Sequence, residues 1–145
     1  WVSLGHDLTF GSTVNPHMLP WLDAVTGSRA FRELSDLEHR GFAAVTGVGG
    51  MSTVVPLIER ERRAIRICLL PEEAWARSYA QYVAIRAHHR SLMLGIEGFR
   101  LREPGKVYYP LHWDGDDFVP IDAAIERLFR ELGWRGWASA RTVKP

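Results

Sequence analysis

Apolar residues recur at helical spacing in two long segments of the chain. In the first segment, residues 71–90, the large apolar side chains at i, i+4, i+7 and i+8 are Trp75, Tyr79, Tyr82 and Val83. This spacing places them on one face of an α-helix. Pro71 suits the first turn, because the N–H that proline lacks would have no partner there. The pattern therefore predicts an amphipathic helix over residues 71–90.

The second clear helix lies near the C-terminal end of the chain. Its apolar residues at i, i+4, i+7 and i+11 are Ile121, Ile125, Leu128 and Leu132. Asp116 or Asp117 is expected to cap this helix, and Gly133 is expected to end it. Glu126 and Arg130 stand four residues apart and are expected to pair on its outer side.

The segments before residue 71 carry weaker patterns. Residues 21–26 predict a short helix, and residues 29–40 predict a longer one with Ser28 as N-cap and Gly41 as its stop. The glycine-rich and β-branched stretch that follows fits a loop or a pair of short strands. Another helix is expected to begin at Pro56, with proline in its first turn.

A loop is predicted after the helix at 71–90, because four residues that disfavour helix follow it: Gly95, Gly98, Pro104 and Gly105. Residues 106–109 are then expected to form a short strand. Taken together, the pattern predicts a single domain over residues 1–145 that is mainly α, with α+β as an alternative and a minor β element. The chain begins with Trp1 and not with Met, so we expect it to be a fragment that lacks an upstream helix.

Composition narrows the function classes. The chain has 145 residues, 18 basic against 17 acidic side chains and a net charge of +1. This balance argues against a nucleic-acid-binding or membrane-surface protein, and the basic cluster at residues 60–66 is interleaved with glutamates. No apolar run is long enough to span a membrane. Cys68 is the single cysteine, which excludes an intrachain disulfide and predicts a buried small side chain.

Glu73 is the residue whose environment matters most for function. At about 100° per residue, Ala76, Ala80 and Ala84 lie on the same side of the helix as Glu73, away from the large aromatic residues. Small residues allow a second helix to approach, so Glu73 is expected either to point toward such a neighbour or to form a surface ion pair with Arg77. A buried carboxylate would need a cation or hydrogen-bond donors, and a metal ion is one such partner.

The stretch "PEEAWARSYAQYVA" resembles the glutamate-bearing helix of phage-associated, zincin-like metallopeptidase domains, which accompany head-morphogenesis proteins and polymorphic toxins. "WLDAVTGSRAFRELSDL" and "HWDGDDFVPIDAAIERLFRELGW" are similar to two further segments of that family. The resemblance implies a zincin-like helical domain in which Glu73 is a zinc ligand. Arg77 and Tyr79 match in register, and the resemblance implies that they orient the ligand or the substrate.

The chain departs from this family at the metal-binding helix, because it contains no His-Glu-x-x-His. In that motif two histidines share a helix face and bind zinc, and the glutamate acts on the bound water. Two alternatives stay open. "VSLGH" is a degenerate motif that keeps His6 as a ligand, or the motif precedes Trp1. In either case the chain supplies Glu73 and His6 as candidate metal ligands and no catalytic residue.

The expected function is a zinc metallopeptidase-like domain that is catalytically incomplete as written and acts on a peptide or protein substrate. The alternative is a non-catalytic module that binds virion proteins or other partners on the same scaffold. Neither hypothesis calls for nucleic acid or a membrane. The expected location is the cytoplasm or a virion.

Overall fold

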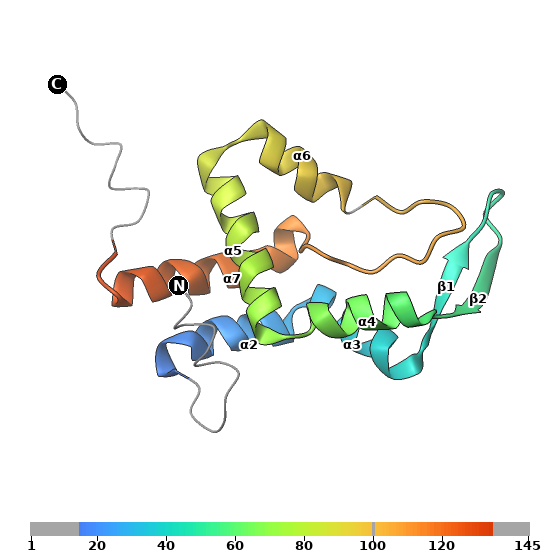
Figure 1. Cartoon of the computed structure of the whole chain (residues 1–145). Coiled ribbons are helices and arrows are strands. Elements are labelled where there is room, and N and C mark those ends of the chain that lie inside the picture. Colours follow the sequence, from blue (N-terminus) through green and yellow to red (C-terminus); the bar gives the residue numbers. More distant parts are fainter. Residues whose placement is uncertain (1–14, 100, 135–145) are drawn as a thin grey trace.

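The computed structural model describes residues 15–99 and 101–134, and within these ranges the chain is mainly helical with one two-stranded sheet (Figure 1). In chain order the elements are η1 (Pro16–Met18), α2 (Leu19–Gly27), α3 (Arg29–Arg40), β1 (Phe42–Thr46), β2 (Ser52–Pro56), α4 (Glu59–Cys68), α5 (Pro71–Ala87), α6 (Arg90–Gly98) and α7 (Gly115–Glu131). The prediction of a mainly α fold with a minor β element is confirmed. No helix in the described ranges is long and apolar enough to cross a bilayer.

Two clusters of buried side chains form the core. The larger cluster joins η1, α2, α5 and α7 and is centred on Met18, Trp21, Trp75, Tyr82, Trp113, Phe118, Ile121, Ile125 and Leu128. The smaller cluster lies between α3, β1 and α4 and contains Leu34, Leu37, Ala43, Leu57, Ile65 and Cys68. Each large side chain that is fully buried contributes roughly 1.5–3 kcal/mol. Three of the four residues predicted for the apolar stripe of α7, Ile121, Ile125 and Leu128, are central to this core, whereas Leu132 follows the helix and is exposed. The prediction that Cys68 is buried is confirmed.

α5 lies between the two clusters and is buried over more than half of its circumference. Trp75 and Tyr82 face α2 and α7, whereas Arg77 and Gln81 are buried on the adjoining side. The exposed strip of the helix is formed by small residues, which are Ala76, Ala80 and Ala87. α5 is thus more deeply enclosed than an amphipathic helix with one apolar face.

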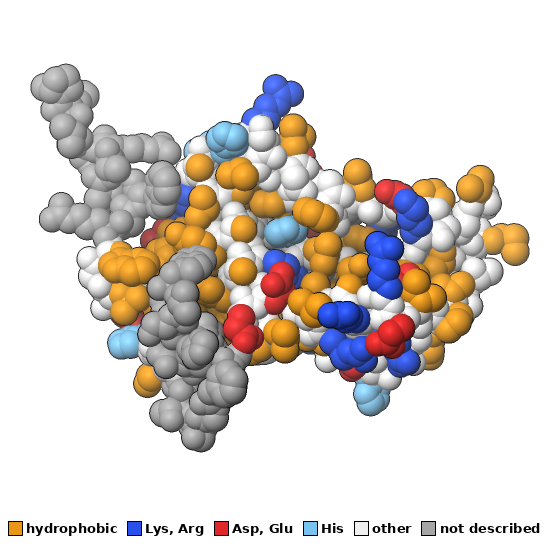
Figure 2. Space-filling model, viewed as in Figure 1, with side chains coloured by type: hydrophobic (Ala, Val, Ile, Leu, Met, Phe, Trp, Pro, Cys, Tyr) orange, Lys and Arg blue, Asp and Glu red, His pale blue; other side chains and the backbone are white. Residues whose placement is uncertain are grey.

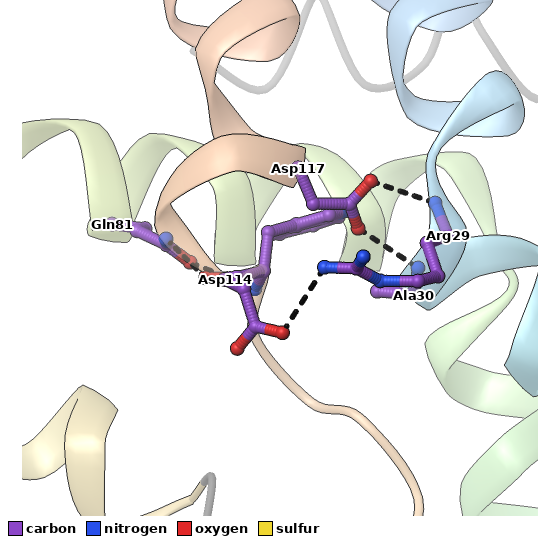
Figure 3. A network of polar contacts seen from close by, with 6 residues as sticks. Arg29, Ala30, Gln81, Asp114 and Asp117 are labelled. Atoms are coloured by element: carbon purple, nitrogen blue, oxygen red, sulfur yellow. Dashed lines mark hydrogen bonds and ion pairs between the residues drawn. The ribbon is translucent and has the colours of Figure 1, made fainter.

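Buried polar contacts fix the segment before α7 onto α5 (Figure 3). The Gln81 amide donates to the backbone carbonyl of Trp113 at 2.8 Å and accepts from its N–H at 3.1 Å. The Trp113 indole N–H donates to Ser28 Oγ at 2.9 Å. Ser28 also accepts from the N–H of Phe31 at 3.2 Å. The N-cap predicted at Ser28 is therefore confirmed, and it is connected to α5 through Trp113.

The cap predicted for α7 is wrong. This helix begins at Gly115 with Asp114 at the N-cap position, and no side chain caps it. Asp117 instead accepts from the N–H groups of Arg29 at 2.7 Å and Ala30 at 2.9 Å, at the start of α3 (Figure 3). The carboxylate satisfies the free donors of a neighbouring helix because tertiary packing brings that N-terminus within reach.

The expectation of a helix from Pro56 is also wrong. Pro56 is the last residue of β2 and lies opposite Phe42. Proline is tolerated there because the N–H at this ladder position would point away from β1. α4 begins at Glu59, and Glu61 accepts from the N–H of Ile58 at 2.9 Å.

Two further expectations about the region after α5 are corrected. The loop predicted from its glycines contains α6, whose Ile96 is 5% exposed and packs into the protein. Packing of such a residue offsets the roughly 1 kcal/mol that each glycine costs in a helix. Residues 106–109 form no strand, and their Val107 and Tyr109 pack against the smaller cluster.

The outer ion pair expected for Glu126 is absent as well. Glu126 lies on the side of α7 that faces α5, where it accepts from the Tyr82 hydroxyl at 2.5 Å and pairs with Arg86 at 3.1 Å. Glu126 directly follows Ile125, about 100° around the helix axis, and the contacts with α5 that draw it inward come from residues distant in sequence.

Candidate functional site

Glu73 lies in the first turn of α5, at the boundary between the buried side of the helix and the exposed alanine strip. Its side chain is partly buried, and its carboxylate has no hydrogen-bond or ion-pair partner among the described residues. The positive end of the helix dipole stabilises a carboxylate at this position. Its negative charge also acts on two neighbours: it adds to the burial that raises the pKa of Cys68, and it partly opposes the burial that lowers the pKa of Arg77.

Arg77 is nine-tenths buried and does not form the surface ion pair with Glu73 that the spacing suggests. Its guanidinium donates from Nη2 to the carbonyl of Cys68 at 2.5 Å and from Nη1 to the carbonyl of Leu111 at 2.6 Å. It also lies 5.3 Å from the ring centroid of Trp113. Arg77 therefore joins the C-terminal end of α4 to the segment before α7, and burial lowers its pKa.

Tyr79 lies in a row of aromatic rings that faces α7. Its ring stacks on Trp75 at 6.0 Å and on Tyr82 at 6.2 Å, and it meets Phe129 edge-on at 5.9 Å. Tyr79 follows Glu73 by six residues in α5, which places it about 120° around the helix axis from Glu73. The structure thus brings Arg77 near Glu73 and sets the Tyr79 ring on another side of the helix.

The histidines do not complete a metal site within the described part of the chain. The proposed ligand His6 lies outside the described residues. His17 contacts Glu131 at 3.1 Å, far along the chain from α5, and His88 and His89 are exposed. Residues 15–99 and 101–134 hold no group of three or more His, Cys, Asp or Glu side chains placed to bind a metal ion. By themselves these residues do not fit a zinc centre, and Glu73 can supply only one of its ligands.

The surface over α5 is of mixed character, which the sequence did not indicate. Figure 2 shows acidic, basic and histidine side chains close together over α5, between hydrophobic side chains of α4 and α6. Exposed apolar residues near these helices include Ile67 of α4 and Leu70 just after it, and Leu92 of α6 and Phe99 just after it. The Phe99 ring lies 5.5 Å from that of His112, which extends the surface toward the segment before α7.

Comparisons with models of known protein families, with curated proteins and with solved structures find no match. The zincin-like resemblance therefore rests on the quoted stretches of sequence. It stays a prediction for Glu73, His6, Arg77 and Tyr79.

Proposed function

We propose that this chain belongs to a zinc metallopeptidase-like domain in which Glu73 is a metal ligand, and that it is catalytically incomplete as written. The observation that carries the proposal is the environment of the Glu73 carboxylate. It is partly buried, has no partner in the described part of the chain and borders a strip of exposed alanines. Carboxylates in such places are usually paired, and a metal ion held with ligands from another segment would provide the missing cation.

Arg77 and Tyr79 support this role as positioning residues. Arg77 anchors the start of α5 to the end of α4, and Tyr79 packs the same helix against α7. Together they hold the backbone that carries Glu73, which is how a ligand is usually kept at a fixed place. In such a domain zinc would activate water for attack on a peptide carbonyl. Since the described residues include neither the base nor the remaining ligands, we derive no step through the metal.

The test is metal content by elemental analysis of the purified chain and of the full-length product of its gene. We expect one zinc per full-length molecule, lost in Glu73→Gln and retained in the control variant Glu97→Gln, which removes an exposed carboxylate of α6. Equal zinc in Glu73→Gln and in the unmodified protein would overturn the assignment of Glu73, and a full-length product without zinc would overturn the metallopeptidase proposal.

A second candidate is a non-catalytic module that binds virion proteins or other partners in the cytoplasm or in a virion. The observation that favours it is a group of exposed apolar side chains in and after α6, formed by Leu92, Leu94, Phe99 and Leu101. Exposed apolar groups of this kind often mark interaction sites. Under this hypothesis a chelator leaves the melting temperature of the full-length product unchanged, whereas a zinc protein would melt at a lower temperature.

A further inference from the structure

The hairpin of β1 and β2 stands at one end of the molecule, and its outer strand is β2 (Figure 1). Two hydrogen bonds bracket the ladder between the strands. The N–H of Gly47 donates to the carbonyl of Met51 at 2.8 Å, and the N–H of Leu57 donates to the carbonyl of Gly41 at 2.9 Å. In an antiparallel pair, bonded and non-bonded positions alternate along each strand. The two bonds therefore define which residues of β2 turn their backbone groups outward.

The outward-facing residues of β2 are Ser52, Val54 and Pro56. Ser52 and Val54 each present an N–H and a carbonyl, and Pro56 presents a carbonyl. No backbone hydrogen bond from residues 15–99 or 101–134 reaches this edge, and Val54 is 68% exposed. The opposite edge of the hairpin differs, because the Gly105 N–H donates to the carbonyl of Thr46 at 2.9 Å. β2 is thus an open edge with strong β-propensity and no charged residue to block a further strand.

A groove lies between the end of β2, α4 and residues 105–109. It is bordered by Val55 and Pro56 of β2, by Arg60 and Ala64 of α4, and by Lys106 and Tyr109. Its lining mixes apolar side chains with two cationic side chains, Arg60 and Lys106, and one carboxylate, that of Glu61. Such a groove can accept alternate side chains of an extended segment that pairs with β2.

The charge around the groove favours an acidic ligand. Glu59 of α4 pairs with Arg66 at 2.7 Å, whereas Glu61 accepts from the N–H of Ile58 and keeps its negative charge. Three arginines of α4 outnumber this one carboxylate. Lys106 pairs with Glu103. Arg60 has no such partner among the described residues, and neither do Arg62 and Arg63, which are exposed on the same helix. Figure 2 shows the resulting group of basic side chains over α4.

We propose that the edge of β2 and this groove bind an extended acidic segment of a partner protein, which adds a third strand to the hairpin. Backbone hydrogen bonds from Ser52 and Val54 would provide affinity, and Arg60 would select acidic side chains. The surface belongs to elements other than α5, so the proposal does not depend on the role of Glu73.

The probe is a blocked, fluorescent octapeptide of alternating valine and glutamate, and the assay is fluorescence anisotropy with the purified chain. Val54→Pro removes the outward N–H and leaves the ladder bonds to β1 in place. We expect this variant to bind about 3- to 10-fold more weakly, which corresponds to one backbone hydrogen bond. Val54→Thr, which keeps the N–H, should bind like the unmodified chain. Circular dichroism checks that both variants are folded.

Electrostatic selection is tested separately. Arg60→Gln should weaken binding about 2- to 5-fold, whereas Arg130→Gln, the same charge change on α7, should leave it unchanged. An octapeptide of alternating valine and lysine, and a valine–glutamate peptide with alternate backbone nitrogens methylated, should both bind poorly.

Equal binding of either control peptide would overturn the proposal. Preferential binding of a single-stranded oligonucleotide that is insensitive to Val54→Pro would also overturn it and would assign the surface to nucleic acid. A dimer in sedimentation that is lost in Val54→Pro, without peptide binding, would assign the edge to a second copy of the chain. Glu73→Gln should leave peptide binding unchanged, so failure of the zinc proposal does not affect this test.

Discussion

Replacement of Arg77 by alanine tests the central feature of the fold. The guanidinium connects three parts of the chain, because it donates to the carbonyls of Cys68 and Leu111 and lies over the ring of Trp113. Arg77→Ala removes these contacts and leaves two main-chain carbonyls without their donors in a buried region. We therefore expect a loss of stability much larger than that of an ordinary surface substitution.

The magnitude follows from the contacts of Arg77. Each hydrogen bond from a charged donor contributes roughly 1.5–3 kcal/mol, and the contact with the ring adds about 0.5–2 kcal/mol. These gains are partly offset, because burial of the guanidinium is costly, as its lowered pKa indicates. We expect a net loss of about 3 kcal/mol. With a urea dependence of about 2 kcal/mol per molar, the midpoint should fall by roughly 1.5 M.

Urea unfolding followed by tryptophan fluorescence measures this loss directly. Arg77→Lys keeps the charge but cannot form the fork of two hydrogen bonds, so its midpoint should lie between those of Arg77→Ala and the unmodified chain. Arg63→Ala is the matched control, since that arginine is exposed and should change stability by less than about 0.5 kcal/mol. A loss below about 1 kcal/mol for Arg77→Ala would refute the argument that this residue organises the fold.

Three further predictions concern other buried groups. Burial and the hydrogen bond to Glu126 raise the pKa of Tyr82. The stability that the neutral Tyr82 hydroxyl provides is therefore fully present below the unfolded-state pKa of about 10, and it is lost as the pH rises through the folded-state pKa. Tyr82→Phe should lower the free energy of unfolding by about 1 kcal/mol at pH 8. As the pH rises above about 10, this free energy should fall less in the variant than in the unmodified chain, as urea unfolding across this range would show. Asp117→Asn should lower stability by about 1–2 kcal/mol because it weakens the cap of α3, whereas Asp116→Asn on the exposed neighbour should not, as thermal melts of the two variants would show. Burial raises the pKa of the Cys68 thiol, so labelling with a thiol reagent at pH 8 should be at least about 100-fold slower in the native chain than in urea.

The sequence predicted the elements whose signals are local. α5 and the apolar stripe of α7 follow from helical periodicity, and Ser28 and Gly41 were recognised as the start and stop of α3 because capping depends on neighbouring residues. Pro56 was misassigned because proline is acceptable both at the start of a helix and at an outward-facing position of an edge strand. Only the pairing partner decides between these two, and that partner lies 14 residues earlier, at Phe42.

The candidate site was predictable in part. The helical angle placed Ala76, Ala80 and Ala84 on the side of Glu73, where a second helix was expected to approach. Ala84 is buried, but Ala76 and Ala80 are exposed, so no described helix covers that part of the stripe. The partners of Arg77 were not predictable, since one of its acceptors is a main-chain carbonyl 34 residues away. Backbone carbonyls carry no sequence signature, so an i, i+4 pair with Glu73 was the expectation that local reasoning favoured.

The contacts of Arg77 bear on how Glu73 would act if it binds zinc. Because Arg77 donates to backbone carbonyls, it leaves the Glu73 carboxylate without a competing ion pair while it fixes the turn of α5 that carries Glu73. The fold would therefore hold Glu73 in place before a metal binds, and Arg77 would not compete with the metal for its carboxylate. Both effects reduce the loss of conformational entropy on metal binding. It follows that Arg77→Lys, if its freed ammonium paired with Glu73, should weaken zinc binding more than it weakens the fold. That comparison separates a positioning role for Arg77 from a purely structural one.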